Sequence, residues 1–228
     1  MRTCTALVFS ILILNTTLQA QNNKIVVVKA GTKVVDYFPL NERYRYKDFI
    51  PGQVIFKNSK SKILNLNYNI LFGEIEFIQS HDTLAITKKE DIRYVVVQDT
   101  FIFDNGYIEI VSGGTIKVGL KQYVKVKDIL EKGAYGTTNR SASIDTYNSM
   151  WLSGNSFDLT PAEDTEFQKM EEYYITNPAG GFILFKKKNV IQLFPDKEDE
   201  IKAYLKAHKV DFESRPDLLR FTEYLRSL

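Results

Sequence analysis

The chain has 228 residues with 30 Lys and Arg and 28 Asp and Glu, so its formal net charge at pH 7 is only +2. A nearly neutral chain has no general electrostatic attraction to polyanions, which argues against a nucleic-acid partner. The single cysteine, Cys4, allows no internal disulfide and no set of thiolate ligands for a metal.

The first 20 residues have the layout of a secretory signal peptide. One basic residue, Arg2, precedes an apolar run from Ala6 to Leu14, and the small residue Ala20 stands at the position of a cleavage site. An uncleaved membrane anchor is the alternative, but this run is shorter than the roughly 20 residues that span a bilayer. We therefore predict that residues 1–20 are removed on export, together with Cys4, and that no transmembrane segment remains after cleavage.

Three short apolar segments after the predicted cleavage site indicate strands, at residues 24–29, 33–38 and 53–57. A basic and aromatic run lies between the second and third segments. Its candidate binding residues are Arg43, Tyr44, Arg45 and Tyr46. Cationic side chains of this kind suit an anionic polymer or a lipid surface. The alternative interpretation is an ordinary solvated loop.

Residues 63–126 give the clearest strand pattern, because Leu64, Leu66 and Tyr68 alternate with asparagines at the period of two expected for a half-buried strand. Further strands are predicted at residues 74–78, 94–98, 100–104, 107–111, 115–120 and 123–126. Asn105-Gly106 and Gly113-Gly114 supply the positive φ angles that tight hairpin turns require. Short strands with close turns predict an antiparallel meander rather than βαβ units.

Residues 133–165 interrupt this pattern and predict a long irregular excursion. Long loops inside compact domains are uncommon, and they are usually functional or disordered. The excursion contains Tyr135 and the only tryptophan, Trp151, so we take both as candidate binding residues. Residues 166–176 then predict a strand or a short helix, and residues 182–185 and 190–194 predict a hairpin.

Two helices are predicted to close the chain. The apolar side of the first helix is formed by Ile201, Tyr204, Leu205 and His208. The apolar side of the second helix is formed by Leu218, Phe221, Leu225 and Leu228. Asp196 and Ser214 are the expected N-caps. We expect the two helices to pack on the sheet or on each other.

The ending Phe194–Leu228 resembles the C-terminal ending of a broad set of uncharacterised exported proteins of Gram-negative envelopes. The lysine-rich segment Phe185–Asn189 is similar to a hairpin of those proteins, and Gly73–Gln79 with Tyr94–Gly106 looks like their strand-rich body. The resemblance implies a location in the periplasm, at the outer membrane or outside the cell, and it carries no catalytic signature. Thr83, in Asp-Thr-Leu, resembles an acceptor site for O-linked glycans in such envelopes.

The residues show no recognisable catalytic or metal-binding pattern. His81 and His208 lack the spacing of metal ligands, so we interpret them as a turn residue and a helix residue and predict neither a metal site nor a cofactor. Glu74 and Glu76 lie two residues apart on a predicted strand, and paired carboxylates are what glycoside hydrolysis needs. Their alternation with apolar residues instead indicates a solvent-facing side of the strand.

These observations predict an α+β, mainly β fold: an antiparallel, meander or sandwich-like body at residues 21–194, with a helix pair at residues 195–228 packed on the same domain. The leading hypothesis for function is a non-enzymatic exported cell-envelope protein that binds a partner protein or an envelope polymer. One alternative is an accessory subunit of an outer-membrane assembly, associated peripherally with that membrane. The other is a hydrolase with a diffuse carboxylate site.

Overall fold

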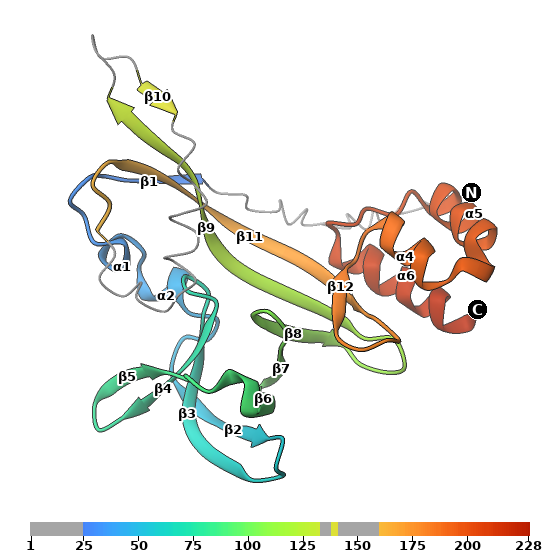
Figure 1. Cartoon of the computed structure of the whole chain (residues 1–228), viewed down its shortest axis with the longest axis horizontal. Coiled ribbons are helices and arrows are strands. Elements are labelled where there is room, and N and C mark those ends of the chain that lie inside the picture. Colours follow the sequence, from blue (N-terminus) through green and yellow to red (C-terminus); the bar gives the residue numbers. More distant parts are fainter. Residues whose placement is uncertain (1–24, 133–137, 141–159) are drawn as a thin grey trace, which may run out of the picture.

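The computed structural model describes residues 25–132, 138–140 and 160–228 of the chain (Figure 1). The predicted signal peptide and the candidate binding residues Tyr135 and Trp151 lie outside these ranges. The strands are β1 (Ile25–Val28), β2 (Ile50–Phe56), β3 (Ser61–Asn69), β4 (Glu74–Gln79), β5 (Asp82–Ala85), β6 (Ile92–Val97), β7 (Asp99–Phe103), β8 (Tyr107–Ser112), β9 (Val118–Lys132), β10 (Thr138–Arg140), β11 (Asp164–Thr176) and β12 (Phe182–Leu184). The helices are α1 (Val34–Tyr37), α2 (Leu40–Arg43), α4 (Lys187–Leu193), α5 (Glu198–His208) and α6 (Arg215–Ser227), with short 3₁₀ helices η1 (Lys89–Asp91) and η4 (Pro195–Lys197).

In the described ranges, 12 strands form one antiparallel sheet in the order β1-β11-β9-β8-β7-β6-β2-β3-β4-β5, with β10 also paired to β9 and β12 also paired to β11. The first and last strands of this order do not pair with each other, so the sheet is open. The predicted class is therefore confirmed: the fold is mainly β, with an antiparallel meander and C-terminal helices.

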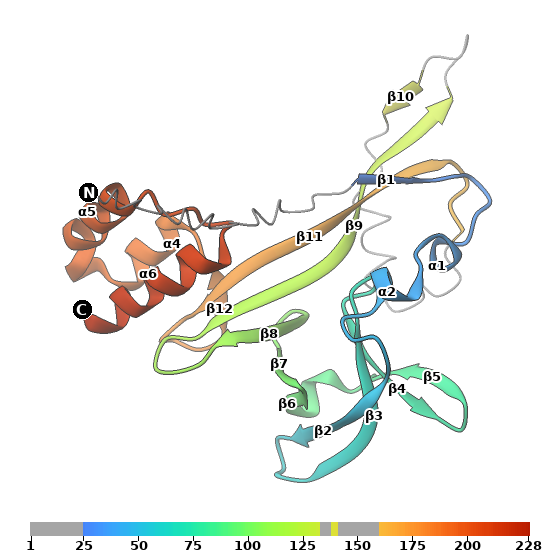
Figure 2. The same ribbon diagram turned by 180° about the vertical axis from the view of Figure 1, so that it is seen from behind.

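The long strands β9 and β11 form a ribbon that connects the N-terminal helices with the C-terminal helices (Figures 1 and 2). Alternate residues of a strand point to the same face. Val118 and Leu120 on one face of β9 belong to the core beneath the C-terminal helices. Val124 and Val126, farther along the same strand, belong to a second core with α1. The ribbon thus supports a separate apolar cluster at each end.

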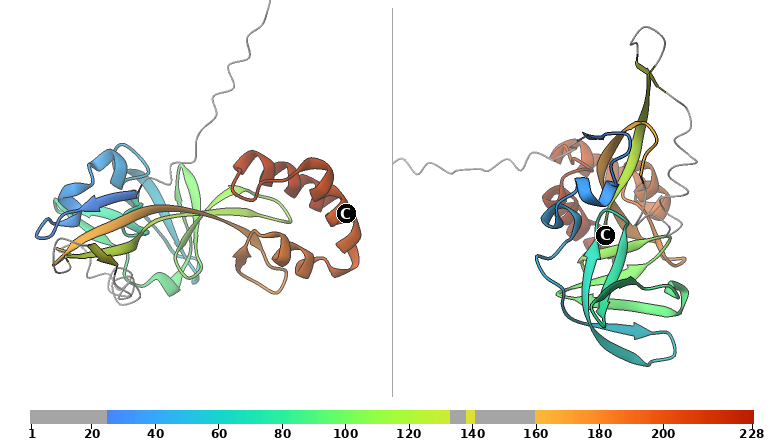
Figure 3. Two further views of the ribbon diagram at one scale, coloured as in Figure 1. Left: turned by 90° about the horizontal axis from the view of Figure 1, so that it is seen from above. Right: turned by 90° about the vertical axis from the view of Figure 1, so that its left-hand side faces the viewer.

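The C-terminal helices lie together at one end of the molecule (Figure 3). Leu218 and Phe221 of α6 are fully buried with Ile201 of α5 against the ends of β9 and β11. Arg226 fixes α6 to the turn after β8, because its Nε donates to the carbonyl of Ile116 at 3.2 Å. Both predicted helices are confirmed, and their apolar sides pack within the chain, except that His208, which was expected on the apolar side of the first helix, is exposed at the end of α5.

Strands β2 to β4 and β6 to β8 curl around a third core. The Tyr68 ring stacks on Phe101 with 5.2 Å between ring centroids, and both residues are buried. The Tyr68 hydroxyl donates to the backbone carbonyl of Gln122 at 2.5 Å. This bond joins β3 to β9, which are not neighbours in the sheet, and so it helps to hold the curled strands against the β9–β11 ribbon.

Several local predictions are wrong, and short apolar runs explain most of them. Residues 33–38 contain helix α1 instead of a strand, because Val34 and Phe38 are buried together at the i, i+4 spacing of a helix. Residues 190–194 lie mainly in α4 instead of a hairpin strand. A short apolar run alone does not distinguish a buried strand from a buried helix.

Strand boundaries account for the other differences. Strand β9 begins only at Val118 and includes residues 118–120 and 123–126, which were predicted to lie in two separate strands; residues 166–176 lie in a strand, β11. The predicted excursion at residues 133–165 contains β10 and the start of β11 among its described residues. Ser214 is the N-cap of α6 but makes no capping bond through its side chain, and η4 moves the N-cap of α5 from Asp196 to Lys197.

Among the described residues, no helix combines the length and the apolar character needed to cross a membrane.

Candidate functional site

The basic and aromatic run at Arg43–Tyr46 is built into the sheet. The backbone amide of Arg45 donates to the carbonyl of Tyr68 at 2.9 Å, and the amide of Ile70 donates to the carbonyl of Arg43 at 2.7 Å. Tyr44 forms an isolated bridge to Asn69 at the end of β3. These backbone bonds fix the direction in which each side chain of the run points.

Arg45 is held by the carboxylate of Glu109 on β8, which is only 3% exposed. Arg45 Nε and Nη2 donate to the two carboxylate oxygens at 3.1 and 3.2 Å, a bidentate pair. Asp99 lies 3.8 Å from the guanidinium and accepts a hydrogen bond from the Tyr46 hydroxyl at 3.0 Å. Burial opposes the charge of Arg45, but the bonds to Glu109 outweigh it and raise the pKa of Arg45. The guanidinium therefore neutralises a buried carboxylate inside the fold.

Tyr44 is joined to a second buried carboxylate, that of Glu76 on β4, by a single hydrogen bond. Glu76 is fully buried, and its two oxygens accept hydrogen bonds from the Tyr44 hydroxyl at 2.7 Å and from Asn69 Nδ2 at 2.8 Å. Burial raises the pKa of Glu76, although these two bonds act in the opposite direction. Burial likewise raises the pKa of Glu74, whose carboxylate pairs with Lys89.

The interpretation of Glu74 and Glu76 as a solvent-facing side is therefore wrong. The run that contains Tyr44 covers β4, which the sequence pattern of β4 alone does not reveal. Both oxygens of Glu76 are engaged within the protein, so this carboxylate offers a substrate no direct contact.

Two of the four predicted binding residues of the run reach an open groove. The groove has a volume of about 440 Å³, and its lining residues are Arg45, Tyr46, Lys47, Asp48, Ile50, Gln98 and Asp99. A more apolar hollow of about 350 Å³ adjoins it at Gln98, and its other lining residues are Pro51, Gly52, Gln53, Ile63 and Val96. Two cations and two anions line the groove, so it favours neither sign of charge. Arg43 and Tyr44 do not line it.

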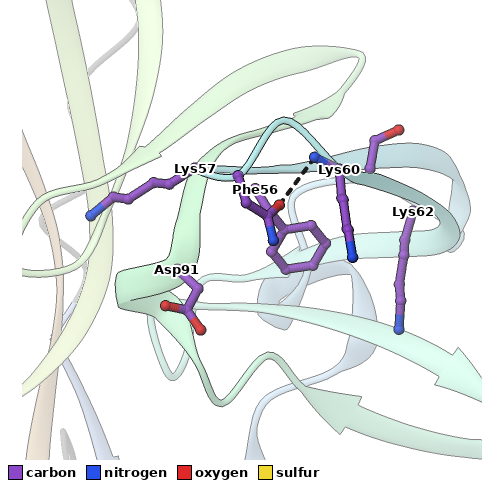
Figure 4. A pocket seen from close by; sticks show the side chains of 7 residues that line it. Phe56, Lys57, Lys60, Lys62 and Asp91 are labelled. Carbon is purple, nitrogen blue, oxygen red and sulfur yellow. Dashed lines mark hydrogen bonds between the residues drawn. The ribbon is translucent and has the colours of Figure 1, made fainter.

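A third hollow, of about 490 Å³, lies at the end of the β2–β3 hairpin (Figure 4). Its lining residues are Phe56, Lys57, Asn58, Lys60, Ser61, Lys62 and Asp91, and we call it the lysine hollow. Figure 4 shows Lys60 and Lys62 extending in the same direction, with the Phe56 ring between them and the carboxylate of Asp91; Lys57 points away from Lys60 and Lys62.

Local structure fixes the shape of the lysine hollow. Ser59 adopts a φ of 64° in the turn, and Asn58 Oδ1 accepts a hydrogen bond from the amide of Lys60 at 3.1 Å. The amide of Lys57 donates to the carbonyl of Asp91 at 2.8 Å, which holds η1 beside the hairpin. Asp91 is therefore fixed next to lysines that lie about thirty positions earlier in the printed sequence.

The lysine hollow offers positive charge to a ligand. Lys57, Lys60 and Lys62 are exposed, and none of them forms an ion pair within the described ranges. Asp91 also lacks an ion pair there, so the four charged residues lining the hollow carry a net charge of +2. Sequence reasoning predicts no site at this hairpin. The signal it missed is three lysines within six residues.

The remaining candidates lie elsewhere. Thr83 is exposed on β5, directly after a turn in which Ser80 and His81 adopt φ angles of 51° and 77°. His208 is exposed at the end of α5, with its ring centroid 4.2 Å from that of Tyr204. Within the part of the chain that the structure describes, no three His, Cys, Asp or Glu side chains are grouped so that they could hold a metal ion.

Comparison of the chain with protein-family models, with curated proteins and with solved structures gave no match. The resemblance of the C-terminal ending to exported envelope proteins therefore stays a prediction.

Proposed function

We propose that this protein is a non-enzymatic, exported cell-envelope protein that binds an anionic envelope polymer in the lysine hollow. The observation that carries the proposal is the set of three exposed lysines, Lys57, Lys60 and Lys62, which gather on one hairpin without ion-pair partners among the described residues. The predicted signal peptide supports a location where the phosphate and carboxylate groups of such polymers are accessible.

The number of lysines favours a polymer over a single small anion. An exposed ion pair contributes only about 0–1 kcal/mol, so one lysine binds an anion weakly. Lys60 and Lys62 extend in the same direction and can engage neighbouring anionic groups of one polymer, and the first contact raises the effective concentration for the next. The arrangement of the lysine hollow therefore suits a ligand with repeated negative charges.

The other functions considered have less support from the geometry. A hydrolase that uses Glu76 would need access to a carboxylate whose oxygens are both engaged inside the fold. An accessory subunit that docks through its terminal helices would need free apolar helix faces, whereas Leu218 and Phe221 are fully buried within this chain.

The proposal is tested by titrating the purified exported protein into fluorescently labelled inorganic polyphosphate and measuring anisotropy. The variant carries Lys57→Gln, Lys60→Gln and Lys62→Gln, and the matched control carries Lys186→Gln, Lys187→Gln and Lys188→Gln, three exposed lysines outside the hollow. At up to about 1 kcal/mol per lysine, the first variant should lose roughly 10- to 100-fold in affinity, and the control should lose far less. Equal losses in both variants would refute the proposal, as would failure of the unaltered protein to bind both polyphosphate and the carboxylated polysaccharide alginate.

A further inference from the structure

The lysine hollow contains more than cations. Its lining includes the carboxylate of Asp91, the ring of Phe56, the amide of Asn58 and the hydroxyl of Ser61. A site that attracted negative charge alone would gain nothing from a carboxylate in its lining, because Asp91 repels an anion that approaches the lysines. Asp91 therefore points to a ligand that also carries hydrogen-bond donors.

The charged groups of the hollow complement such a mixed ligand. A lysine ammonium can only donate hydrogen bonds, and an ionised carboxylate can only accept them. Asp91 forms no ion pair among the described residues, so its oxygens are available for donors of a ligand. The backbone hydrogen bond from the amide of Lys57 to the carbonyl of Asp91 holds the hairpin that carries the lysines beside the Asp91 carboxylate.

The position of Phe56 adds an apolar surface between these groups. In Figure 4 the Phe56 ring lies between the carboxylate of Asp91 on one side and the side chains of Lys60 and Lys62 on the other. The ring is only partly buried, so part of it is open to the hollow. An aromatic ring offers a flat apolar surface, which matches the C–H face of a sugar ring.

We propose that the ligand of the lysine hollow is an acidic polysaccharide. Its carboxylate or other anionic groups bind Lys60 and Lys62, its hydroxyl groups donate to Asp91, and the C–H face of a sugar ring packs on Phe56. This inference rests on the proposed function and names the class of polymer. A polymer of phosphate groups alone has neither the hydroxyl groups for Asp91 nor the apolar face for Phe56.

The test compares two probes on the same protein: alginate, a carboxylated polysaccharide, and inorganic polyphosphate, which has charge without sugar. The variant is Asp91→Asn, and the matched control is Glu90→Gln, an exposed neighbour that does not line the hollow. Loss of hydrogen bonds to a charged acceptor should weaken alginate binding about tenfold. The same variant should bind polyphosphate severalfold more tightly, because a repulsive charge is gone.

The opposite directions of these two changes keep the test decisive. Asp91→Asn strengthening both interactions would mean that only charge matters, and the inference would fail while the proposed function stands. The unaltered protein binding neither anionic probe would overturn both. Phe56→Leu, with folding checked by circular dichroism, is a second test: it should weaken alginate binding and leave polyphosphate binding unchanged. Equal loss for both probes would contradict the role given to the ring.

Discussion

The pair of Arg45 and Glu109 gives the sharpest prediction about what holds the fold together. Arg45→Met removes the guanidinium and leaves the Glu109 carboxylate, which is 3% exposed, without its bidentate partner. Breaking a buried ion pair in this way costs about 3–5 kcal/mol. Since the side chain of Arg45 is 33% exposed, water can reach the vacated position, and we expect the lower end, about 3 kcal/mol.

A double variant separates the cost of leaving the Glu109 charge buried and unpaired from the cost of the packing that is lost with the Arg45 side chain. Glu109→Gln in the Arg45→Met background removes the uncompensated buried charge, so we expect it to recover about 1–2 kcal/mol of the lost stability. The assay is urea-induced unfolding followed by far-ultraviolet circular dichroism, with the free energy of unfolding extrapolated to water. A loss below about 1 kcal/mol for Arg45→Met, or strictly additive effects of the two substitutions, would show that the pair does not act as described.

Two further predictions concern the buried carboxylate of β4 and the helical core. The raised pKa of Glu76, which faces Tyr44, Asn69, Arg43 and Glu74, means that this carboxyl group takes up a proton more readily in the folded state than in the unfolded state. The stability that this proton uptake contributes is fully present below the usual pKa of 4.5, and it is lost as the pH rises through the raised pKa of Glu76. Glu76→Gln should therefore reduce the dependence of the free energy of unfolding on pH in the range from 4.5 to the raised pKa, measured by urea unfolding at several pH values. Phe221→Ala should cost about 3–5 kcal/mol in urea unfolding, because it opens a cavity in the core of the C-terminal helices, and a cost below about 1 kcal/mol would contradict that packing.

The mainly β fold was predictable because its signals are local. Strands β7 and β8 are short, and the turn residues Asn105 and Gly106 stand between them, with φ angles of 49° and 117° in the folded chain. Helices α1 and α4 were missed because each is a short apolar run whose class depends on the surface it packs against. Val190 is fully buried in the core of the C-terminal helices, a contact that the sequence does not display.

The sites depend on contacts between distant parts of the sequence. Arg43–Tyr46 reads as a free basic patch until Glu76, Asp99 and Glu109 are found beside it. The lysines at the end of the β2–β3 hairpin are visible in the sequence, but Asp91 reaches them only through the pairing of β2 with β6. Which cations are neutralised and which remain available for a ligand is therefore decided by the fold.

The central claim is that the lysine hollow binds an anionic polymer, and the salt dependence of binding tests it most directly. The measurement is the affinity of the exported protein for inorganic polyphosphate over a range of salt concentrations, for the unaltered protein and for the variant with Lys57, Lys60 and Lys62 replaced by Gln. Each lysine that releases a counterion contributes about 1 to the slope of log affinity against log salt concentration. We predict that this negative slope is shallower by about 2–3 in the variant than in the unaltered protein. An unchanged slope would mean that the polymer binds elsewhere and that the hollow is not the site.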